Sequence, residues 1–262
     1  MLLVVAGHTI TNSYLTNVEN SLSFKIIWAL QMPLFMLISG YVTFYSNPIK
    51  SARELVQYGG KKSMAYLFPW CIWTIIVRGF LLGGWTIHSF SNNIINLLWN
   101  MDSGYWFLTS LWTIQILWGI SSYICRRAFS AHALCKVVLT SCISLVMSVF
   151  LLVLGYFVGF SFLGIKLTCY YLPFFLLGCI FPYLIASLNG TSGYRLIERV
   201  MVCASAMIFL FLVISRNFYT AVDTIKNVLE RVVCSLCGCG VLVYTIYRLN
   251  GKLPERLKTA LV

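Results

Sequence analysis

The sequence predicts an all-α protein, a polytopic bundle of helices that spans a membrane about eight times. Of the 262 residues, 60% are hydrophobic and 10% are charged, whereas soluble domains are about 45–50% apolar and about 25% charged. The apolar residues form runs of about 20 residues, the length of helix that crosses ~30 Å of hydrocarbon. These runs are continuous rather than alternating with polar positions, which argues against a transmembrane β-barrel.

The apolar runs place the helices in order along the chain. The first, at about 1–10, is too short to cross alone and lacks the basic segment and the cleavage segment of a signal peptide. Full spans are predicted at about 24–45, 64–83, 105–124, 137–157, 168–187, 200–215 and 230–248. No repeat or linker divides them, so a single transmembrane domain over residues 1–262 is expected.

The net charge of +12 is explained mainly by topology. Four segments between spans, at about 46–63, 125–136, 188–199 and 248–262, hold thirteen of the 19 Lys and Arg residues. The positive-inside rule predicts that these segments are cytoplasmic and that the alternate loops face outward. The same charges also have the capacity to hold an anionic cytoplasmic ligand or lipid headgroup, so an interaction with membrane lipid is expected and one with nucleic acid is not.

The ten cysteines lie mostly inside apolar runs, where a thiol behaves as a small buried hydrophobe. We expect them to be reduced. Cys234, Cys237 and Cys239 also suggest a metal site, but that site would need further ligands and deprotonated thiols in hydrocarbon. Helix packing is the preferred interpretation, and no metal is expected.

Ionisable groups inside a membrane are costly and are therefore candidates for function. His8 lies near the outward end of the first apolar run, where an imidazole can act as a general base on a hydroxyl. It can equally be an interfacial histidine that bonds to a neighbouring helix. Arg78, near the outward end of its span, either extends to the interface or holds an anion within the bundle.

The second span contains a predicted kink and a small-residue seam. Pro33 removes a backbone donor within the helix, and Ser39-Gly40 permits a neighbouring helix to approach closely. A kinked helix beside such a seam can line a cavity, and it can equally be a packing device.

A series of motifs resembles the acyltransferase family 3 membrane proteins, multi-span bacterial enzymes that acylate cell-surface sugars. Residues 4–9, VVAGHT, are similar to the family segment around its catalytic histidine, and residues 32–41, MPLFMLISGY, to its PLFFxISGY signature. Lys61-Lys62 followed by LFPW at 67–70 resembles its basic entry into the third helix, and GYWFL at 104–108 its G-x-WFL opening of the fourth. Beyond residue 125 the likeness rests on helix count and on FFLLG at 174–178.

The resemblance, which is nearest to the branch of fucose 4-O-acetylases, implies an O-acetyltransferase of the bacterial cytoplasmic (inner) membrane. Acetyl-coenzyme A would be the cytoplasmic donor, and a surface polysaccharide or its lipid-linked precursor would be the acceptor. His8 is the position that carries over as catalytic, and Lys61 and Lys62 are candidates to bind the donor's phosphates. Candidates to line the cavity are Ser39, Tyr41, Arg78 and Trp106.

Two departures from the family leave alternatives open. The family has a basic residue about ten positions before its histidine and about ten helices, whereas seven residues precede His8 and about eight spans are predicted. The chain is therefore expected to be shortened at both ends, as a fragment or an inactive remnant, unless the missing pieces are dispensable. A transporter or flippase of a lipid-linked sugar is the alternative from another class, although neither paired intramembrane charges nor matching broken helices indicate it.

Overall fold

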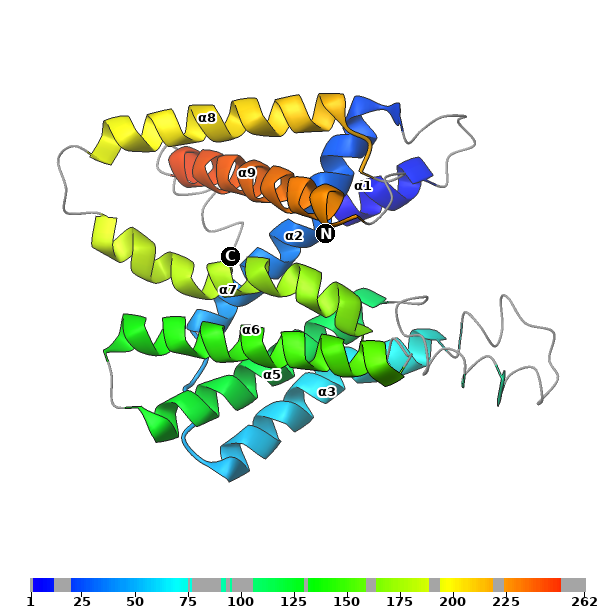
Figure 1. Cartoon of the computed structure of the whole chain (residues 1–262), viewed down its shortest axis with the longest axis vertical. Coiled ribbons are helices and arrows are strands. Elements are labelled where there is room, and N and C mark those ends of the chain that lie inside the picture. The colour runs from blue at the N-terminus through cyan, green and yellow to red at the C-terminus, as the bar shows by residue number, and fades with distance from the viewer. Residues whose placement is uncertain are drawn as a thin grey trace. The chain divides into compact units, whose positions relative to one another are not determined.

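The computed structural model describes residues 2–11, 20–74, 76, 91–92, 95, 106–129, 132–158, 164–188, 194–218 and 224–250. Within these residues the fold is all-helical (Figure 1), as predicted. The helices are α1 (Leu2–Thr11), α2 (Leu22–Phe44), α3 (Ala52–Thr74), α5 (Trp106–Ala128), α6 (Ala133–Val158), α7 (Ile165–Leu188), α8 (Tyr194–Ser215) and α9 (Ile225–Asn250). The chain divides into two compact units: a central unit, Met36–Leu184, and a terminal unit, Met1–Phe35 with Ile185–Val262.

Helix α5 is the core of the central unit, and both α3 and α6 pack along it. It buries polar as well as apolar side chains, namely Thr109, Ser110, Thr113, Gln115 and Ser121. On α6 a row of buried hydroxyl groups, Thr140, Ser141, Ser144 and Ser148, bonds to backbone carbonyls of the same helix at 2.7–2.9 Å. Hydroxyl groups satisfied in this way allow helices to approach closely within a membrane.

Helices α2 and α7 are in backbone contact within the central unit. A Cβ atom added to Gly40 would lie 2.8 Å from the carbonyl carbon of Phe175, and one added to Gly178 would lie 2.8 Å from the backbone nitrogen of Tyr41. The thiol of Cys179 donates a hydrogen bond to the carbonyl of Gly40 at 3.3 Å. The close helix approach predicted at Ser39-Gly40 is thus confirmed, with α7 as the partner.

The terminal unit contains α1, the first part of α2, α8 and α9, with α8 packed along α9. Gly238 of α9 makes room for Leu30 and Phe209, whose side chains would lie 2.6 Å from an added Cβ. Where α8 ends and α9 begins, Arg216 pairs with Glu230 at 3.1 Å. This ionic contact lies on a side that the charge distribution predicts to face outward.

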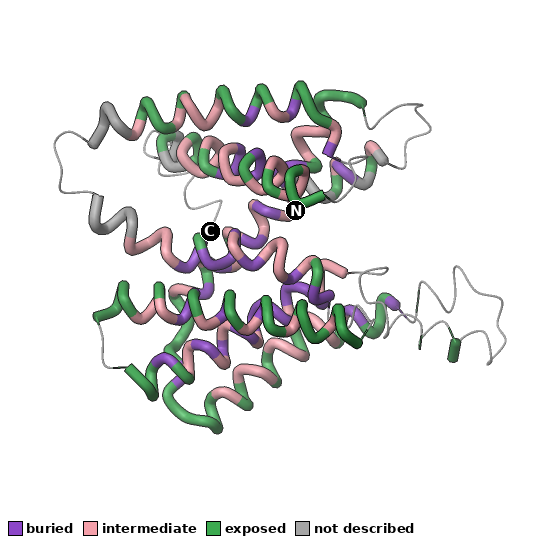
Figure 2. The backbone as a smooth tube through the Cα atoms, viewed as in Figure 1, coloured by how far each residue is buried: buried purple, intermediate pink, exposed green. Residues whose placement is uncertain are grey.

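Among the helices that the structure describes, five are long and apolar enough to cross a membrane: Leu22–Phe44, Ala133–Val158, Ile165–Tyr183, Glu198–Ser215 and Ile225–Ile246. Exposed residues lie along α6 and α8 (Figure 2). They include the apolar Phe150, Phe157, Met207 and Phe211, as expected for helices that face lipid. The chain is therefore a multi-pass membrane protein. None of its ten cysteines forms a disulfide.

Helix α3 begins about a dozen residues before the span predicted at 64–83. Ser51 and Glu54 cap this early start in a variant of the capping box: the Ser51 hydroxyl accepts from the Glu54 backbone N–H at 3.2 Å, and the Glu54 carboxylate accepts from the backbone N–H of Lys50, the residue before the cap, at 2.7 Å. The segment assigned to a cytoplasmic loop is therefore largely helical.

Candidate cationic cavity

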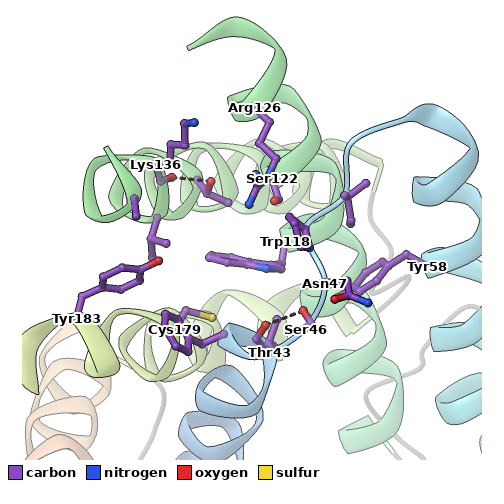
Figure 3. A pocket seen from close by; sticks show the side chains of 16 residues that line it. Thr43, Ser46, Asn47, Tyr58, Trp118, Ser122, Arg126, Lys136, Cys179 and Tyr183 are labelled. Carbon is purple, nitrogen blue, oxygen red and sulfur yellow. Dashed lines mark hydrogen bonds between the residues drawn. The ribbon is translucent and has the colours of Figure 1, made fainter. Parts of the chain in front are cut away.

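The central unit contains a cavity with a volume of about 270 Å³ (Figure 3). Helices α2, α3, α5, α6 and α7 and the connection after α2 form its walls, through Thr43, Phe44, Ser46, Asn47, Pro48, Ile49, Tyr58, Trp118, Ser122, Arg126, Ala133, Lys136, Val137, Thr140, Cys179 and Tyr183. Several of these lie in or beside the segments 46–63 and 125–136, so the positive-inside rule predicts that the cavity faces the cytoplasm.

The lining of the cavity is cationic. Arg126 lies in the last turn of α5 and Lys136 in the first turn of α6, and no carboxylate lies among the described residues of the lining. Figure 3 shows Arg126 extending toward Ser122, while the ammonium group of Lys136 points away from the Trp118 ring. The next residue, Arg127, is occupied elsewhere, because it donates to the Tyr123 hydroxyl at 2.8 Å. Arg126 is therefore the guanidinium available to an anion in this cavity.

A hydrogen-bonded chain of side chains fixes the wall of the cavity where three helices meet. The Tyr58 hydroxyl of α3 donates to Gln115 Oε1 of α5 at 2.5 Å, and Gln115 Nε2 donates to Thr43 Oγ1 of α2 at 3.2 Å. Burial raises the pKa of Tyr58, so its hydroxyl stays protonated and remains a donor. Trp118 is held by an edge-on contact with Phe175, with ring centroids 5.9 Å apart.

This arrangement can bind an anion but carries no acid–base pair. No imidazole lies among the described lining residues, and Cys179, the one thiol there, is hydrogen-bonded to a backbone carbonyl. Within the described part of the chain, no group of three His, Cys, Asp or Glu side chains could hold a metal ion. The cavity has the character of a binding site.

The lysines predicted to bind the donor lie close to the cavity but do not line it. Lys62 lies over the rings of Tyr58 and Tyr66, 5.3 and 5.8 Å from their centroids, and Lys61 is exposed on α3. Burial lowers the pKa of Lys62. Tyr58 connects Lys62 to the cavity, because its ring contacts the Lys62 ammonium group and Tyr58 also lines the cavity. A donor-binding role for the two lysines stays a prediction.

The predicted catalytic histidine lies on α1. The side chain of His8 is outside the described residues, as is all of Arg78. The preceding residue is buried against α2: a Cβ atom on Gly7 would lie 2.6 Å from Gln31 Oε1. That oxygen is buried and has no hydrogen-bond partner within the described part of the structure. The backbone beside His8 is thus packed against a buried polar group of α2.

The other candidates to line a cavity do not line this one. The backbone carbonyl of Ser39 accepts from the Thr43 hydroxyl at 2.8 Å, and the Tyr41 hydroxyl is 3.0 Å from that of Tyr45. Trp106 stacks on Tyr171 with ring centroids 5.4 Å apart and an interplanar angle of 14°. Their predicted role at a site stays a prediction.

Arg126 and Lys136 were not among the residues predicted for a site. Both lie in the basic segment 125–136, which predicts the topology. This clustering of positive charge is the sequence feature that could have indicated their role at a site. The segments 46–63 and 125–136 carry charge of the same sign on the same predicted side, so their meeting at one cavity follows if the corresponding helices are neighbours.

A family model described as an acyltransferase domain matches residues 1–260, nearly the whole chain. No curated protein and no solved structure matches the chain significantly. The match confirms the family that the motif series at residues 4–9, 32–41 and 104–108 resembles. The chain therefore belongs to acyltransferase family 3 and is a multi-pass membrane acyltransferase.

Proposed function

We propose that the protein is a membrane O-acetyltransferase of the bacterial inner membrane. It transfers an acetyl group from cytoplasmic acetyl-coenzyme A to a hydroxyl of a surface polysaccharide or of its lipid-linked precursor. The motif series, nearest to the branch of fucose 4-O-acetylases, supports a carbohydrate hydroxyl as the acceptor.

One observation carries the proposal: the family match covers the helix that bears His8, and that helix packs against α2 at the preceding residue, Gly7. A Cβ atom added to Gly7 would lie 2.6 Å from Gln31 Oε1 and 3.3 Å from Ile27 Cγ2, so α1 packs closely on side chains of α2 at this position. A histidine attached to a fixed backbone is suited to act as a positioned general base.

In the proposed reaction the acceptor hydroxyl oxygen attacks the thioester carbonyl carbon of acetyl-coenzyme A. His8 takes the hydroxyl proton as the new C–O bond forms. The C–S bond then breaks, and the imidazolium returns the proton to the departing thiolate. The products are the acetyl ester and free coenzyme A, and no covalent acyl-enzyme is required.

The test compares acetyl ester on the surface glycan of cells that carry the wild-type chain, His8→Ala or His132→Ala. His132 is a matched control because it is an exposed histidine between α5 and α6. Loss of a general base should lower the transfer rate by about 10²–10⁴-fold, while His132→Ala should keep full activity. Equal ester content in His8→Ala and wild type, at equal membrane abundance, would remove His8 from the mechanism. Movement of the glycan lipid without consumption of acetyl-coenzyme A would favour a flippase instead.

A further inference from the structure

We propose that the cavity of the central unit binds the phosphate groups of the acyl donor, with Arg126 as the main contact and Lys136 as a second cation. The inference rests on the proposed function for the identity of the donor. It assigns the donor's charged end to a place that no sequence motif indicated, at the junction of α5 and α6.

The charges at the cavity carry the first step. The described lining contains Arg126 and Lys136 and no carboxylate, so it carries a positive potential. The Lys136 ammonium group points away from the Trp118 ring (Figure 3), so Lys136 adds to this potential without a direct contact. Arg127 is bonded to Tyr123, whereas Arg126 extends into the cavity wall beside Ser122 (Figure 3). A guanidinium binds phosphate oxygens with two parallel hydrogen bonds, which a single ammonium cannot do. Arg126 should therefore contribute more to affinity than Lys136.

The remaining lining groups suit a phosphorylated ligand. The hydroxyl groups of Ser122 and Tyr183, from two helices, and the Asn47 amide lie around the Trp118 ring (Figure 3). These groups can donate to phosphate oxygens, whereas the Thr43 hydroxyl already donates to the Ser39 carbonyl; the indole supplies an apolar face. We therefore expect a ligand with two parts: an anionic, polar group and, beside it, a flat or apolar group that contacts the Trp118 ring.

The volume limits what enters the cavity. About 270 Å³ lies near the lower end of the roughly 300–1,000 Å³ of typical ligand pockets. Coenzyme A is larger than a typical drug-sized ligand, so only part of it fits. We assign to the cavity the phosphate-bearing part, and the acyl-pantetheine arm must extend beyond it.

The experiment measures binding directly, so that it does not depend on acetylation. The full-length chain in phosphatidylcholine nanodiscs is titrated with coenzyme A and with pantetheine, which has the same thiol arm but no phosphate. Arg126→Gln should weaken coenzyme A binding at least about tenfold, and Lys136→Gln less. Arg126→Lys should recover part of the loss, and pantetheine affinity should not change in any variant.

Arg127→Gln is the matched control, since it removes the neighbouring guanidinium, which does not line the cavity. It should keep coenzyme A affinity within about twofold, which also shows that a charge change at this helix end does not unfold the protein. Equal affinities in Arg126→Gln and Arg127→Gln would overturn the assignment while leaving the proposed acetylation intact. Absence of coenzyme A binding by the wild type would overturn both.

Phosphate chemistry is also offered by lipid headgroups, and a second arm separates the two sources. Nanodiscs that contain phosphatidylglycerol are compared for lipid enrichment around the wild type and Arg126→Gln. If Arg126→Gln loses bound phosphatidylglycerol but keeps its coenzyme A affinity, the cavity is a lipid site and the proposal is wrong. If coenzyme A affinity falls in both lipid mixtures, the donor assignment stands.

Discussion

Replacing Gly40 by alanine should force α2 and α7 apart. The new Cβ atom would lie 2.8 Å from the carbonyl carbon of Phe175 and 3.1 Å from the backbone nitrogen of Cys179. Carbon atoms pack best at about 3.5–4.0 Å, so relief of the carbon contact alone requires the helices to separate by about 0.7–1.2 Å. The Phe175 carbonyl oxygen lies still closer to the new Cβ atom and requires a larger movement. The atoms in the way belong to the backbone, so no rotation of a side chain relieves the contact.

The expected cost follows from two opposing terms. Overpacking typically costs about 1–3 kcal/mol, and a clash against rigid backbone should reach the upper end of that range. Alanine returns about 1 kcal/mol through its better helix propensity. The free energy of unfolding should therefore fall by about 2 kcal/mol, which corresponds to a melting temperature about 4–8 °C lower for a chain of this size.

Thermal unfolding of the purified protein in detergent measures this shift, with Gly240→Ala as the control. Gly240 also lies within a candidate span, but a Cβ atom there meets nothing within 4 Å. Gly240→Ala should leave the melting temperature unchanged or raise it slightly. The reasoning is refuted if the two variants melt at the same temperature. Gly178→Ala acts on the same helix pair, so the double variant with Gly40→Ala should cost less than the sum of the two.

Three further perturbations have defined outcomes. Tyr58→Phe removes the donor to Gln115 and leaves a buried oxygen unpaired, so the free energy of unfolding should fall by about 1–3 kcal/mol in a thermal melt. Gly238→Ala should cost less than Gly40→Ala, because only side chains of α2 and α8 lie within 2.7 Å of the new Cβ and these can turn; the same melts compare them. Ser51→Ala should remove about 1 kcal/mol of capping and speed amide hydrogen exchange in the first turn of α3, as read by mass spectrometry.

Each of these has a result that would contradict it. For Tyr58→Phe the control is Tyr123→Phe, whose hydroxyl bonds only at an exposed position, and equal melting temperatures would show that the buried bond adds nothing. A larger drop in melting temperature for Gly238→Ala than for Gly40→Ala would contradict the reasoning, because it would mean that the neighbouring side chains adjust less readily than the neighbouring backbone. If amide hydrogen exchange in the first turn of α3 is unchanged by Ser51→Ala, the cap at Ser51 does not explain why α3 begins early.

The spans were predictable where apolar runs are long, because a helix in lipid must be apolar over about 20 residues. This held for α2, α6, α7, α8 and α9. It fails at the start of α3, because residues 52–63 are less apolar than a span and are predicted to lie between spans. The serine and the glutamate three residues later are a helix-start signal that hydropathy does not register.

The site was harder to predict because its residues meet through tertiary packing. The proline and glycine of α2 indicated a close approach, but nothing in the sequence indicated which helix would be the neighbour. The sequence identifies Arg126 and Lys136 only as part of the charge pattern that predicts topology. Their place in a cavity depends on Trp118 and the end of α2, which come together only in the folded protein. The sequence indicates Lys61 and Lys62 as a basic pair for binding the donor. In the structure Lys62 contacts two tyrosine rings, and neither lysine lines the cavity.

The buried hydroxyl and amide groups of α5 have a consequence for how the chain enters the membrane during synthesis. Taken alone, α5 would present Thr113, Gln115 and Ser121 to lipid, and it is not among the helices apolar enough to span unaided. Its neighbours α3 and α6 cover these groups, and Gln115 finds its partners on α2 and α3. The partners of Gln115 lie on helices made earlier in the chain, so we expect stable insertion of α5 to depend on α2 and α3 already lying beside it in the membrane.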